Sequence, residues 1–326
     1  MKYKGSKKQN EISVFAKTFI IAFALILLIT TPVMAWMGKT LDLTPGDPDM
    51  PVFERDLPID VLIPESSPFF DAFTNAKKVN VLVLGVNQNL ADTIMLVSLD
   101  TKNKHVDAIW VPRDTYYFRE GYYGEYERKL NAAYREKDPT IIAKAVSNIL
   151  LGMPINYYVI IGYDGIVNIV DSMGGVPMDI PKAMKYNDPL DTPPLHIDIP
   201  AGEQVLDGEH AVQFLRYRKG YTEGDLGRIK AQQQFILSAF KQCLSFDLPK
   251  IAGTVYENVT SDVSLKTALF LAGKGIGITG EDINTYMMPG YADPNPPYYV
   301  HPKSEKIAEI LTEIYSIEKI EEETEE

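Results

Sequence analysis

Three arginines gather in one stretch of an acidic chain. The stretch RYRKGYTEGDLGRIKAQQQ contains Arg216, Arg218 and Arg228, together with Asp225 and Gln232. The chain carries a formal net charge of −12, so cations are scarce in it. Neighbouring guanidinium groups repel one another unless an anion lies between them. The stretch therefore raises the question of which anion it binds.

The expected elements bring these side chains together. HAVQFLRYR is predicted to end as a strand, from which Arg216 and Arg218 project on the same face. A helix beginning near Asp225 places Arg228 and Gln232 four residues apart on one side. Guanidinium forks match phosphate oxygens in pairs, so a diphosphate is the natural ligand, ahead of sulfate or clustered carboxylates. Two alternatives stay open: surface ion pairs of the arginines, and Asp225 acting only as a helix N-cap.

A second group of charged residues flanks a predicted β-hairpin. The strands DTIMLVSLD and VDAIWV are joined by the short turn TKNKH, which favours an antiparallel pair. Asp92 precedes the first of these strands and Arg113 follows the second, so both are expected at one end of the sheet. An aspartate there is suited to bind Mg²⁺, and Arg113 to neutralise phosphate charge. Alternatively, Arg113 and Asp114 form a structural ion pair that ties down the loop.

The composition excludes several classes of protein. Of the 326 residues, 45% are hydrophobic, which is enough for one large core or two smaller ones. The sequence pI near 4.9 argues against general nucleic-acid binding, so no nucleic-acid partner is expected. The single cysteine excludes an internal disulfide framework and a cysteine-based metal site.

The N-terminal residues predict a membrane anchor. Residues 1–17 form a tail with five lysines, and residues 18–38 are uncharged and apolar, long enough to span a bilayer as a helix. The lysines predict a cytoplasmic N-terminus, with everything after the span outside the cytoplasm. The alternative is a cleaved secretory signal with its processing site near Ala35, which places the rest of the chain on the same side.

Beyond this segment, the chain indicates a linker and one α/β domain. Residues 39–78 are rich in Pro and Asp and are interpreted as a linker. The domain is expected over 79–318, as a three-layer α/β/α sandwich with a mixed central sheet. A helix capped by Asp138 and a strand–helix–strand unit over 157–181 are predicted within it. Residues 319–326 form an acidic, solvated tail.

Several motifs, in order, resemble the LytR–CpsA–Psr family. They are NVLVLGV, ADTIMLVSLD, VPRDTYY, KLNAAY, IVDSMGGV, LDGEHAVQFLRYR and GDLGRIKAQQQ. Members of that family are membrane-anchored extracytoplasmic enzymes, mostly of Gram-positive bacteria. The resemblance implies a single-pass membrane protein that transfers an anionic glycopolymer, such as teichoic acid or capsule polysaccharide, from undecaprenyl pyrophosphate to peptidoglycan. It implies Mg²⁺ or Mn²⁺ as cofactor, and a pyrophosphatase side activity.

By motif position, the resemblance also assigns roles to residues. The pyrophosphate-binding set comprises Arg113, Arg216, Arg218, Asp225, Arg228 and Gln232. The catalytic set comprises Asp92, Arg113 and Asp114, with the general base left open between the two aspartates. Asp92 and Asn87 are the expected metal ligands.

The chain departs from the family pattern within the site. Asn87 stands where the family usually has the aspartate of Gly-x-Asp, and Leu90 where it usually has an arginine. Ala231 replaces a further arginine in the last motif. Each preorganised charge that is lost typically costs about 2–4 kcal/mol of transition-state stabilisation. The alternative function is therefore a catalytically weak or inactive tethered module that binds polyprenyl pyrophosphates to regulate or sequester them.

Tyrosines crowd the loop after VPRDT. Their positions are Tyr116, Tyr117, Tyr122, Tyr123 and Tyr126. Two interpretations remain equally open: the rings stack on sugars, or the loop packs over the end of the sheet.

Overall fold

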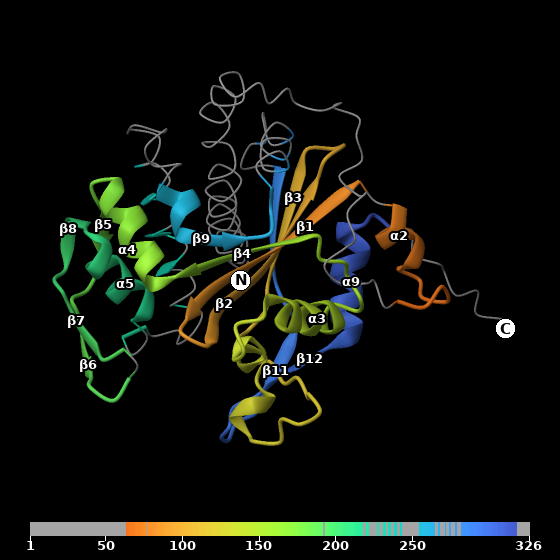
Figure 1. Ribbon diagram of the computed structural model, residues 1–326, viewed down its shortest axis with the longest axis horizontal. Coiled ribbons are helices and arrows are strands. Elements are labelled where there is room, and N and C mark those ends of the chain that lie inside the picture. Colours follow the sequence, from red (N-terminus) through yellow and green to blue (C-terminus); the bar gives the residue numbers. More distant parts are fainter. Residues whose placement is uncertain are drawn as a thin grey trace, which may run out of the picture. The chain divides into compact units, whose positions relative to one another are not determined.

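The computed structural model describes residues 63–75, 77–191, 193–217, 254–264 and 282–317, with isolated positions between 220 and 278 (Figure 1). The predicted span over 18–38 and the two charged tails lie outside these residues. Within the described part of the chain, no helix is both long and apolar enough to cross a membrane.

A six-stranded sheet forms the centre of the fold, in the order β10-β3-β2-β1-β4-β9. The strands are β1 (Lys78–Asn87), β2 (Leu90–Asp100), β3 (His105–Trp110), β4 (Tyr157–Gly162), β9 (Val259–Ser261) and β10 (Ile283–Met287). β1 and β3 both pair antiparallel with β2, so they run in the same direction. The expected hairpin and the mixed α/β class are confirmed, whereas the three-layer arrangement stays a prediction.

The chain divides into two compact units. The sheet unit comprises Pro51–Val159 and Thr285–Glu326, and the middle unit contains Ile160–Asn284. In the sheet unit, β1–β3 are accompanied by α2 (Phe70–Asn75), η1 (Tyr126–Arg128), η2 (Leu130–Tyr134), α3 (Pro139–Ile149), the hairpin β11 (Gly290–Ala292) and β12 (Val300–Pro302), and α9 (Ser304–Ile314).

One helix of the sheet unit was predicted from the sequence, and two others were not. The Asp138 side chain accepts a hydrogen bond from the Thr140 backbone N at 2.8 Å, which confirms the predicted N-cap of α3. In α9, buried Ile307, Leu311 and Ile314 recur at helical spacing. α2 lies within the segment interpreted as a linker, and its buried Phe73 packs edge-on against Tyr315 at 4.8 Å between ring centroids. The folded part of the chain therefore begins before Val79.

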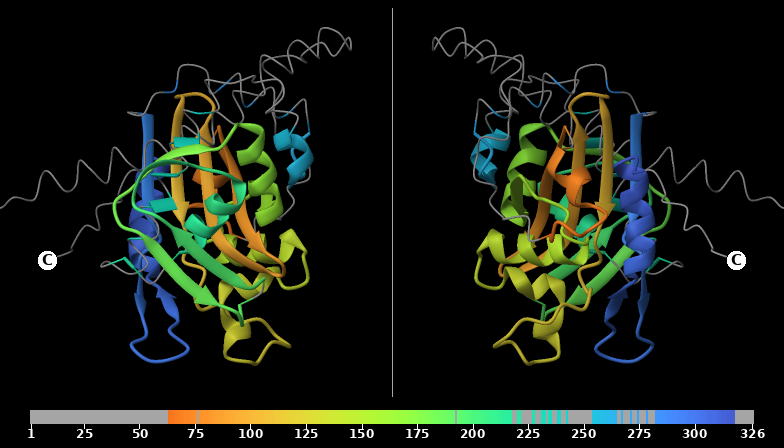
Figure 2. Two further views of the ribbon diagram at one scale, coloured as in Figure 1. Left: turned by 90° about the vertical axis from the view of Figure 1, so that its left-hand side faces the viewer. Right: turned by 90° about the vertical axis from the view of Figure 1, so that its right-hand side faces the viewer.

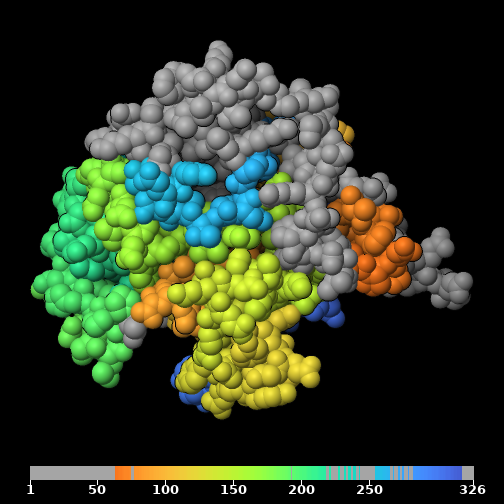
Figure 3. All heavy atoms as spheres, viewed as in Figure 1, coloured from red at the N-terminus to blue at the C-terminus, as the bar shows by residue number. Residues whose placement is uncertain are grey.

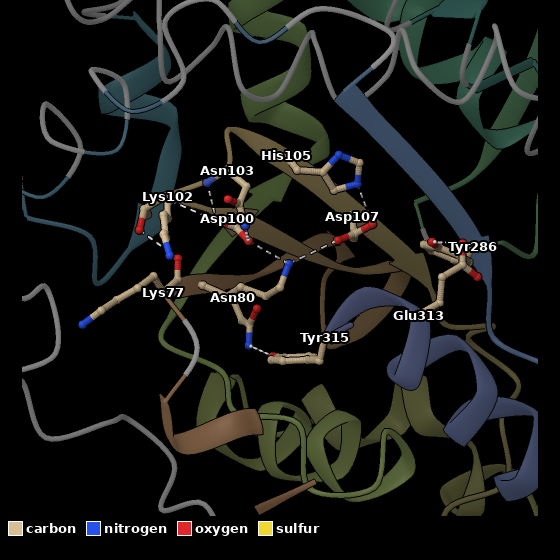
Figure 4. A network of polar contacts seen from close by, with 12 residues as sticks. Lys77, Asn80, Asp100, Lys102, Asn103, His105, Asp107, Tyr286, Glu313 and Tyr315 are labelled. Carbon is tan, nitrogen blue, oxygen red and sulfur yellow. Dashed lines mark hydrogen bonds and ion pairs between the residues drawn. The ribbon is translucent and has the colours of Figure 1, made fainter. Parts of the chain in front are cut away.

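One end of the sheet carries a buried polar layer (Figure 4). Asn80 of β1 donates from Nδ2 to the Pro154 carbonyl at 2.7 Å and to the Tyr315 hydroxyl at 3.1 Å. Burial raises the pKa of Tyr315, more than the hydrogen bond from Asn80 lowers it. Lys78 places its ammonium group 3.5 Å from Asp100 and 3.6 Å from Asp107. The layer joins three neighbouring strands to the end of α9.

The middle unit begins at the end of β4 and is built on short strand pairs. It contains α4 (Tyr163–Ser172), β5 (Val176–Ile180), β6 (Met184–Asp188), β7 (Leu195–Ile199), β8 (Gly202–Leu206) and α5 (Gly208–Arg216) (Figures 1 and 2). The predicted strand–helix–strand order is confirmed for β4, α4 and β5, with Gly174 and Gly175 at positive φ in the turn. However, β5 pairs antiparallel with β8 in a separate two-stranded sheet, so the three elements are not a β-α-β unit of one sheet.

The prediction of a strand over HAVQFLRYR is wrong. Residues Gly208–Arg216 form the helix α5, and Asp207 caps it by accepting from the His210 backbone N at 2.9 Å. Ala211 and Phe214 are buried one helical turn apart, which is the period of a helix and not of a strand. Arg216 therefore closes a helix.

Candidate functional site

Asp92 and Arg113 meet at the end of the β2–β3 hairpin. The register pairs Met95 with Trp110, so residues before Met95 and after Trp110 lie at the same end. There, Nη1 of Arg113 donates to Oδ1 of Asp92 in a short, charge-assisted hydrogen bond. The two side chains are 22% and 20% exposed, so the pair is shielded from most solvent yet reachable. The predicted convergence of these two residues is confirmed.

A β-bulge aims Asp92 at this end of the sheet. Gly85 pairs with Thr93 and Val86 with Ala91, so Asp92 is skipped by the register between β1 and β2. Bulges release one residue from the ladder and re-aim its side chain, often beside active sites. Glycine is favoured at position 85, beside the bulge, because a Cβ there would lie in tight contact, 3.1 Å from the Thr93 Cβ.

Asp114 extends the pair into a row of alternating charges. Its Oδ2 lies 3.7 Å from Nε of Arg113, and its Oδ1 accepts a 2.8 Å hydrogen bond from Nζ of Lys129. Both carboxylate oxygens of Asp114 thus face cations, which suits a positioning role. Lys129, only 12% exposed, was not predicted as a site residue. The sequence signal for Lys129 is its place in the motif KLNAAY, two residues before Asn131. In the structure, the Asn131 backbone N donates to the Arg113 carbonyl at 3.0 Å, which brings this motif to the site.

The expected metal ligands are oxygen donors of the right kind. Asn87 ends β1 and pairs across the turn with Leu90, two residues before Asp92. Among the described residues, no group of three or more His, Cys, Asp or Glu side chains gathers as a metal site. A cation held here would take its other oxygens from substrate phosphates and water, as Mg²⁺ bound by one or two carboxylates usually does. The residues therefore fit a divalent cation that binds together with its substrate.

In the middle unit, Arg216 is held by an acidic loop. Its Nη2 donates to Oδ2 of Asp191 at 3.0 Å and to the Pro193 carbonyl at 2.9 Å. The guanidinium carbon lies 5.1 Å from the ring centroid of Tyr163, within cation–π range. Because the side chain is only 8% exposed, Asp191 occupies the position that an anionic ligand of Arg216 would take.

Gln232 lies beside the end of α5. Its Nε2 donates to the Leu215 carbonyl at 3.1 Å, one residue before Arg216. This contact is to a backbone carbonyl, so the predicted convergence of Gln232 with the arginine side chains stays a prediction. Arg218, Asp225 and Arg228 lie outside the described residues, so their predicted roles stay predictions.

Comparison with known proteins identifies the family. A model of the LytR_cpsA_psr family matches residues 60–315 of this chain. The chain belongs to the LytR–CpsA–Psr family. Bacillus subtilis TagV, a polyisoprenyl-teichoic acid–peptidoglycan teichoic acid transferase, is 30% identical over 256 residues, which make up 73% of this chain and 64% of TagV. The match thus spans less than two thirds of TagV.

One further relative and the solved structure of TagV support this assignment. The regulatory protein MsrR of Staphylococcus aureus strain COL is 30% identical over 236 residues, which are 68% of each chain. The crystal structure of B. subtilis TagV superposes with a TM-score of 0.59 at 28% identity, over 74% of this chain and 99% of that one. The family fold expected from the motifs is therefore confirmed.

The three departures from the LytR–CpsA–Psr pattern occupy different environments. Ala231 is buried in the core of the middle unit, in a cluster that also contains Phe214 and Phe235. The space of an arginine is thus filled by packed apolar side chains. Asn87 and Leu90 instead lie at the tip of the β1–β2 hairpin, where Leu90 is 36% exposed.

Proposed function

We propose that the chain is an extracytoplasmic phosphotransferase that moves an anionic glycopolymer from undecaprenyl pyrophosphate to peptidoglycan. The observation that carries this proposal is Arg113, held between two carboxylates beside a bulge, in a chain related to a teichoic acid transferase. Residues 18–38 would anchor the enzyme in the cell membrane of a Gram-positive bacterium. The glycopolymer is of the teichoic acid or capsule class.

Arg113 would bind the diphosphate of the donor. Its guanidinium group is charged at every physiological pH and presents several donors in one plane, which match phosphate oxygens. Arg216 of the middle unit is a further predicted pyrophosphate-binding residue, which a phosphate group would engage by displacing Asp191. Arg218 and Arg228 keep the pyrophosphate-binding roles predicted from the sequence. Phosphoryl transfer depends mainly on positioning and on neutralising charge in the transition state, and this is what such a set provides.

Asp92 is the carboxylate that we assign to the reaction. A hydroxyl of the peptidoglycan glycan attacks the phosphorus that bears the glycopolymer, and its proton passes to Asp92. The bond from that phosphorus to the bridging oxygen breaks, and undecaprenyl phosphate leaves with the electron pair. Asp114, whose oxygens are both engaged, positions Arg113 and Lys129. Mg²⁺ or Mn²⁺ bound by Asp92 with Asn87 would neutralise charge on the diphosphate.

A transfer assay with purified lipid-linked glycopolymer and a peptidoglycan acceptor tests this proposal. Arg113→Ala should lower the transfer rate by roughly 10²–10³-fold, the usual cost of one preorganised donor. The matched control is Arg135→Ala, which removes an arginine that pairs with Glu127 at 2.6 Å. Transfer by the Arg113→Ala/Arg218→Ala variant within twofold of wild type would refute the assignment.

A second candidate function is supported by Asn87 and Leu90. With a carboxylate and a guanidinium absent from the hairpin tip, the site would hold a polyprenyl pyrophosphate without turning it over. Tight, metal-independent binding of the donor, combined with no transfer to any acceptor, would favour this tethered binding module over the enzyme.

A further inference from the structure

Exposed aromatic rings concentrate in two segments of the sheet unit, the loop 116–135 and the β11–β12 hairpin, 290–302. Among the described residues outside these segments, Tyr256 is the one exposed aromatic side chain, at 67%. The others define an aromatic surface: Phe118 (50%), Tyr123 (62%), Tyr126 (65%), Tyr291 (54%) and Tyr298 (55%). Soluble proteins rarely expose so many neighbouring rings unless they bind something.

Backbone contacts join the two segments. The Tyr116 backbone N donates to the Val300 carbonyl at 2.8 Å, and the Val300 backbone N donates to the Asp114 carbonyl at 3.0 Å. The Tyr299 hydroxyl donates to the Glu125 carbonyl at 2.6 Å. The loop (yellow) and the β11–β12 hairpin (blue) accordingly extend from the same end of the sheet in Figures 1 and 2.

The exposed ring of Tyr291 packs on less exposed rings. Tyr291 stacks on His301 with 4.9 Å between centroids, and His301 stacks on Tyr116 at 5.4 Å. Oδ2 of Asp293 fixes the imidazole of His301 at 3.0 Å from Nε2. The exposed ring of Tyr291 is therefore the outer member of an ordered stack, and it is preorganised to receive another flat ligand.

The aromatic surface is continuous with the candidate active site. Lys129, which holds Asp114 at 2.8 Å, also lies 5.4 Å from the ring centroid of Tyr126. A ligand on the aromatic surface would therefore reach the row of charges that contains Arg113.

The charges of the loop favour a neutral ligand. Arg119 donates to the carbonyls of Glu127 at 3.0 Å and Ala132 at 2.9 Å. Lys129 is engaged by Asp114, and Arg135 by Glu127. These three cations are directed at protein oxygens, and the Nε of Arg128, a fourth cation of the loop, is buried. Surfaces that bind anionic lipids instead present basic clusters to the headgroups. In Figure 3 the loop (yellow) lies on the surface, at the lower edge of the view.

We propose that the aromatic surface binds the glycan strand of the acceptor. The ligand would be an uncharged chain of N-acetylated amino sugars, whose apolar ring faces stack on the tyrosines while its hydroxyls bond to the phenol groups. This inference rests on the proposed function, because it assigns a binding surface to the acceptor of the proposed transfer. It makes the loop and the hairpin the elements that deliver the attacking hydroxyl.

The proposal is tested by calorimetry on the full chain in nanodiscs. The ligand is a chito-oligosaccharide, a soluble and uncharged oligomer of N-acetylglucosamine that represents the acceptor glycan strand. The test variant is Tyr123→Ala/Tyr291→Ala, with one ring from each segment. We expect its dissociation constant to rise at least tenfold, while donor binding and the thermal unfolding temperature stay unchanged. The matched control is Tyr256→Ala, which should bind like wild type.

The outcomes separate this inference from the proposed function. If wild type binds no glycan strand, or if the double variant binds within twofold of wild type, the inference is overturned even where transfer occurs. If glycan binding falls as expected but wild type transfers no glycopolymer, the binding surface stands and the proposed function fails. Quenching of Tyr123 and Tyr291 fluorescence by brominated nanodisc lipids would assign the surface to the membrane and overturn the inference.

Discussion

Lys78 provides the charge that balances a fully buried carboxylate. Asp107 is 1% exposed, and the Lys78 ammonium group lies 3.6 Å from its Oδ2 (Figure 4). Asp100, the other partner of Lys78, also accepts hydrogen bonds from the backbone N of Lys102 and Asn103 at 2.9 and 2.7 Å. Asp107 has His105 as its other partner, with Nε2 3.1 Å from Oδ1, but Lys78 is the lysine that balances its charge. Lys78→Met, which keeps the length of the side chain, should lower the free energy of unfolding by about 3–5 kcal/mol.

A double variant tests whether the loss of unfolding free energy comes from the contact between Lys78 and Asp107. Lys78→Met/Asp107→Asn also removes the carboxylate that the single change leaves without its lysine, so we expect most of the loss to be recovered. Asp107→Asn alone should cost less than Lys78→Met, because Lys78 keeps Asp100 as a partner. The two changes should therefore be non-additive by about 1–3 kcal/mol, as expected for a direct contact.

Urea unfolding measures these differences through tryptophan fluorescence. Trp110 is buried in β3, the strand that carries Asp107, and Trp36→Phe leaves it as the single reporter. A shift of the midpoint at constant m-value gives the change in unfolding free energy. A Lys78→Met cost below about 1 kcal/mol, or a double variant whose loss equals the sum of the singles, would refute the reasoning.

Three further predictions concern the middle unit. The hydrogen bond from the His210 backbone N holds the pKa of Asp207 below its usual value, so its cap stabilises fully above pH of about 3.9 and is lost as pH falls through the lower folded pKa. In urea unfolding, Asp207→Ala should cost about 1 kcal/mol at pH 7, whereas Asp207→Asn should keep the cap and lose the acid dependence. Gly208→Ala places a Cβ 2.5 Å from a backbone oxygen of α4, and the free energy of unfolding should fall by about 1–3 kcal/mol. An unchanged thermal midpoint would contradict this close packing. Asp191→Asn removes the ion pair with Arg216, which is worth about 1 kcal/mol. Binding of a polyprenyl pyrophosphate, measured by fluorescence polarisation, should therefore tighten about fivefold. Weaker binding would show that Asp191 supports the site.

The predicted part of the site depended on local rules. Alternating apolar runs joined by a short turn determine an antiparallel hairpin, and the hairpin brings Asp92 and Arg113 together whatever the rest of the chain does. No local sequence pattern predicts the bulge that re-aims Asp92, because the bulge depends on how β1 pairs with β2.

The failed strand prediction had a local signal that was available. Asp207, three residues before His210, is an N-cap pattern, and Gly208, Ala211 and Phe214 recur at helical spacing. Alternation in the last four letters, LRYR, outweighed that pattern in the sequence interpretation. A capping residue and one helical turn are stronger evidence than a single alternating pair.

Other features required tertiary contacts that local sequence does not encode. The hydrogen bond between Asn80 and Tyr315 spans 235 positions, and Lys129 reaches Asp114 across 15. Each depends on a loop or helix that folds back onto the sheet, so periodicity and capping do not predict it. The resemblance to the family assigned Asp114, but it gave no partner for it.

The two departures at the hairpin tip compensate for one another in charge. Asn87 lacks the family's usual carboxylate and Leu90 lacks its usual guanidinium, and the two residues are register partners across the β1–β2 turn. One negative and one positive charge are thus absent from facing positions, which leaves the local net charge unchanged and no ion without its partner. The Asp92–Arg113 pair keeps its own balance beyond the bulge. In the proposed mechanism, this paired loss would weaken donor binding more than it would disturb Asp92, which is why we favour an enzyme over a pure binding module.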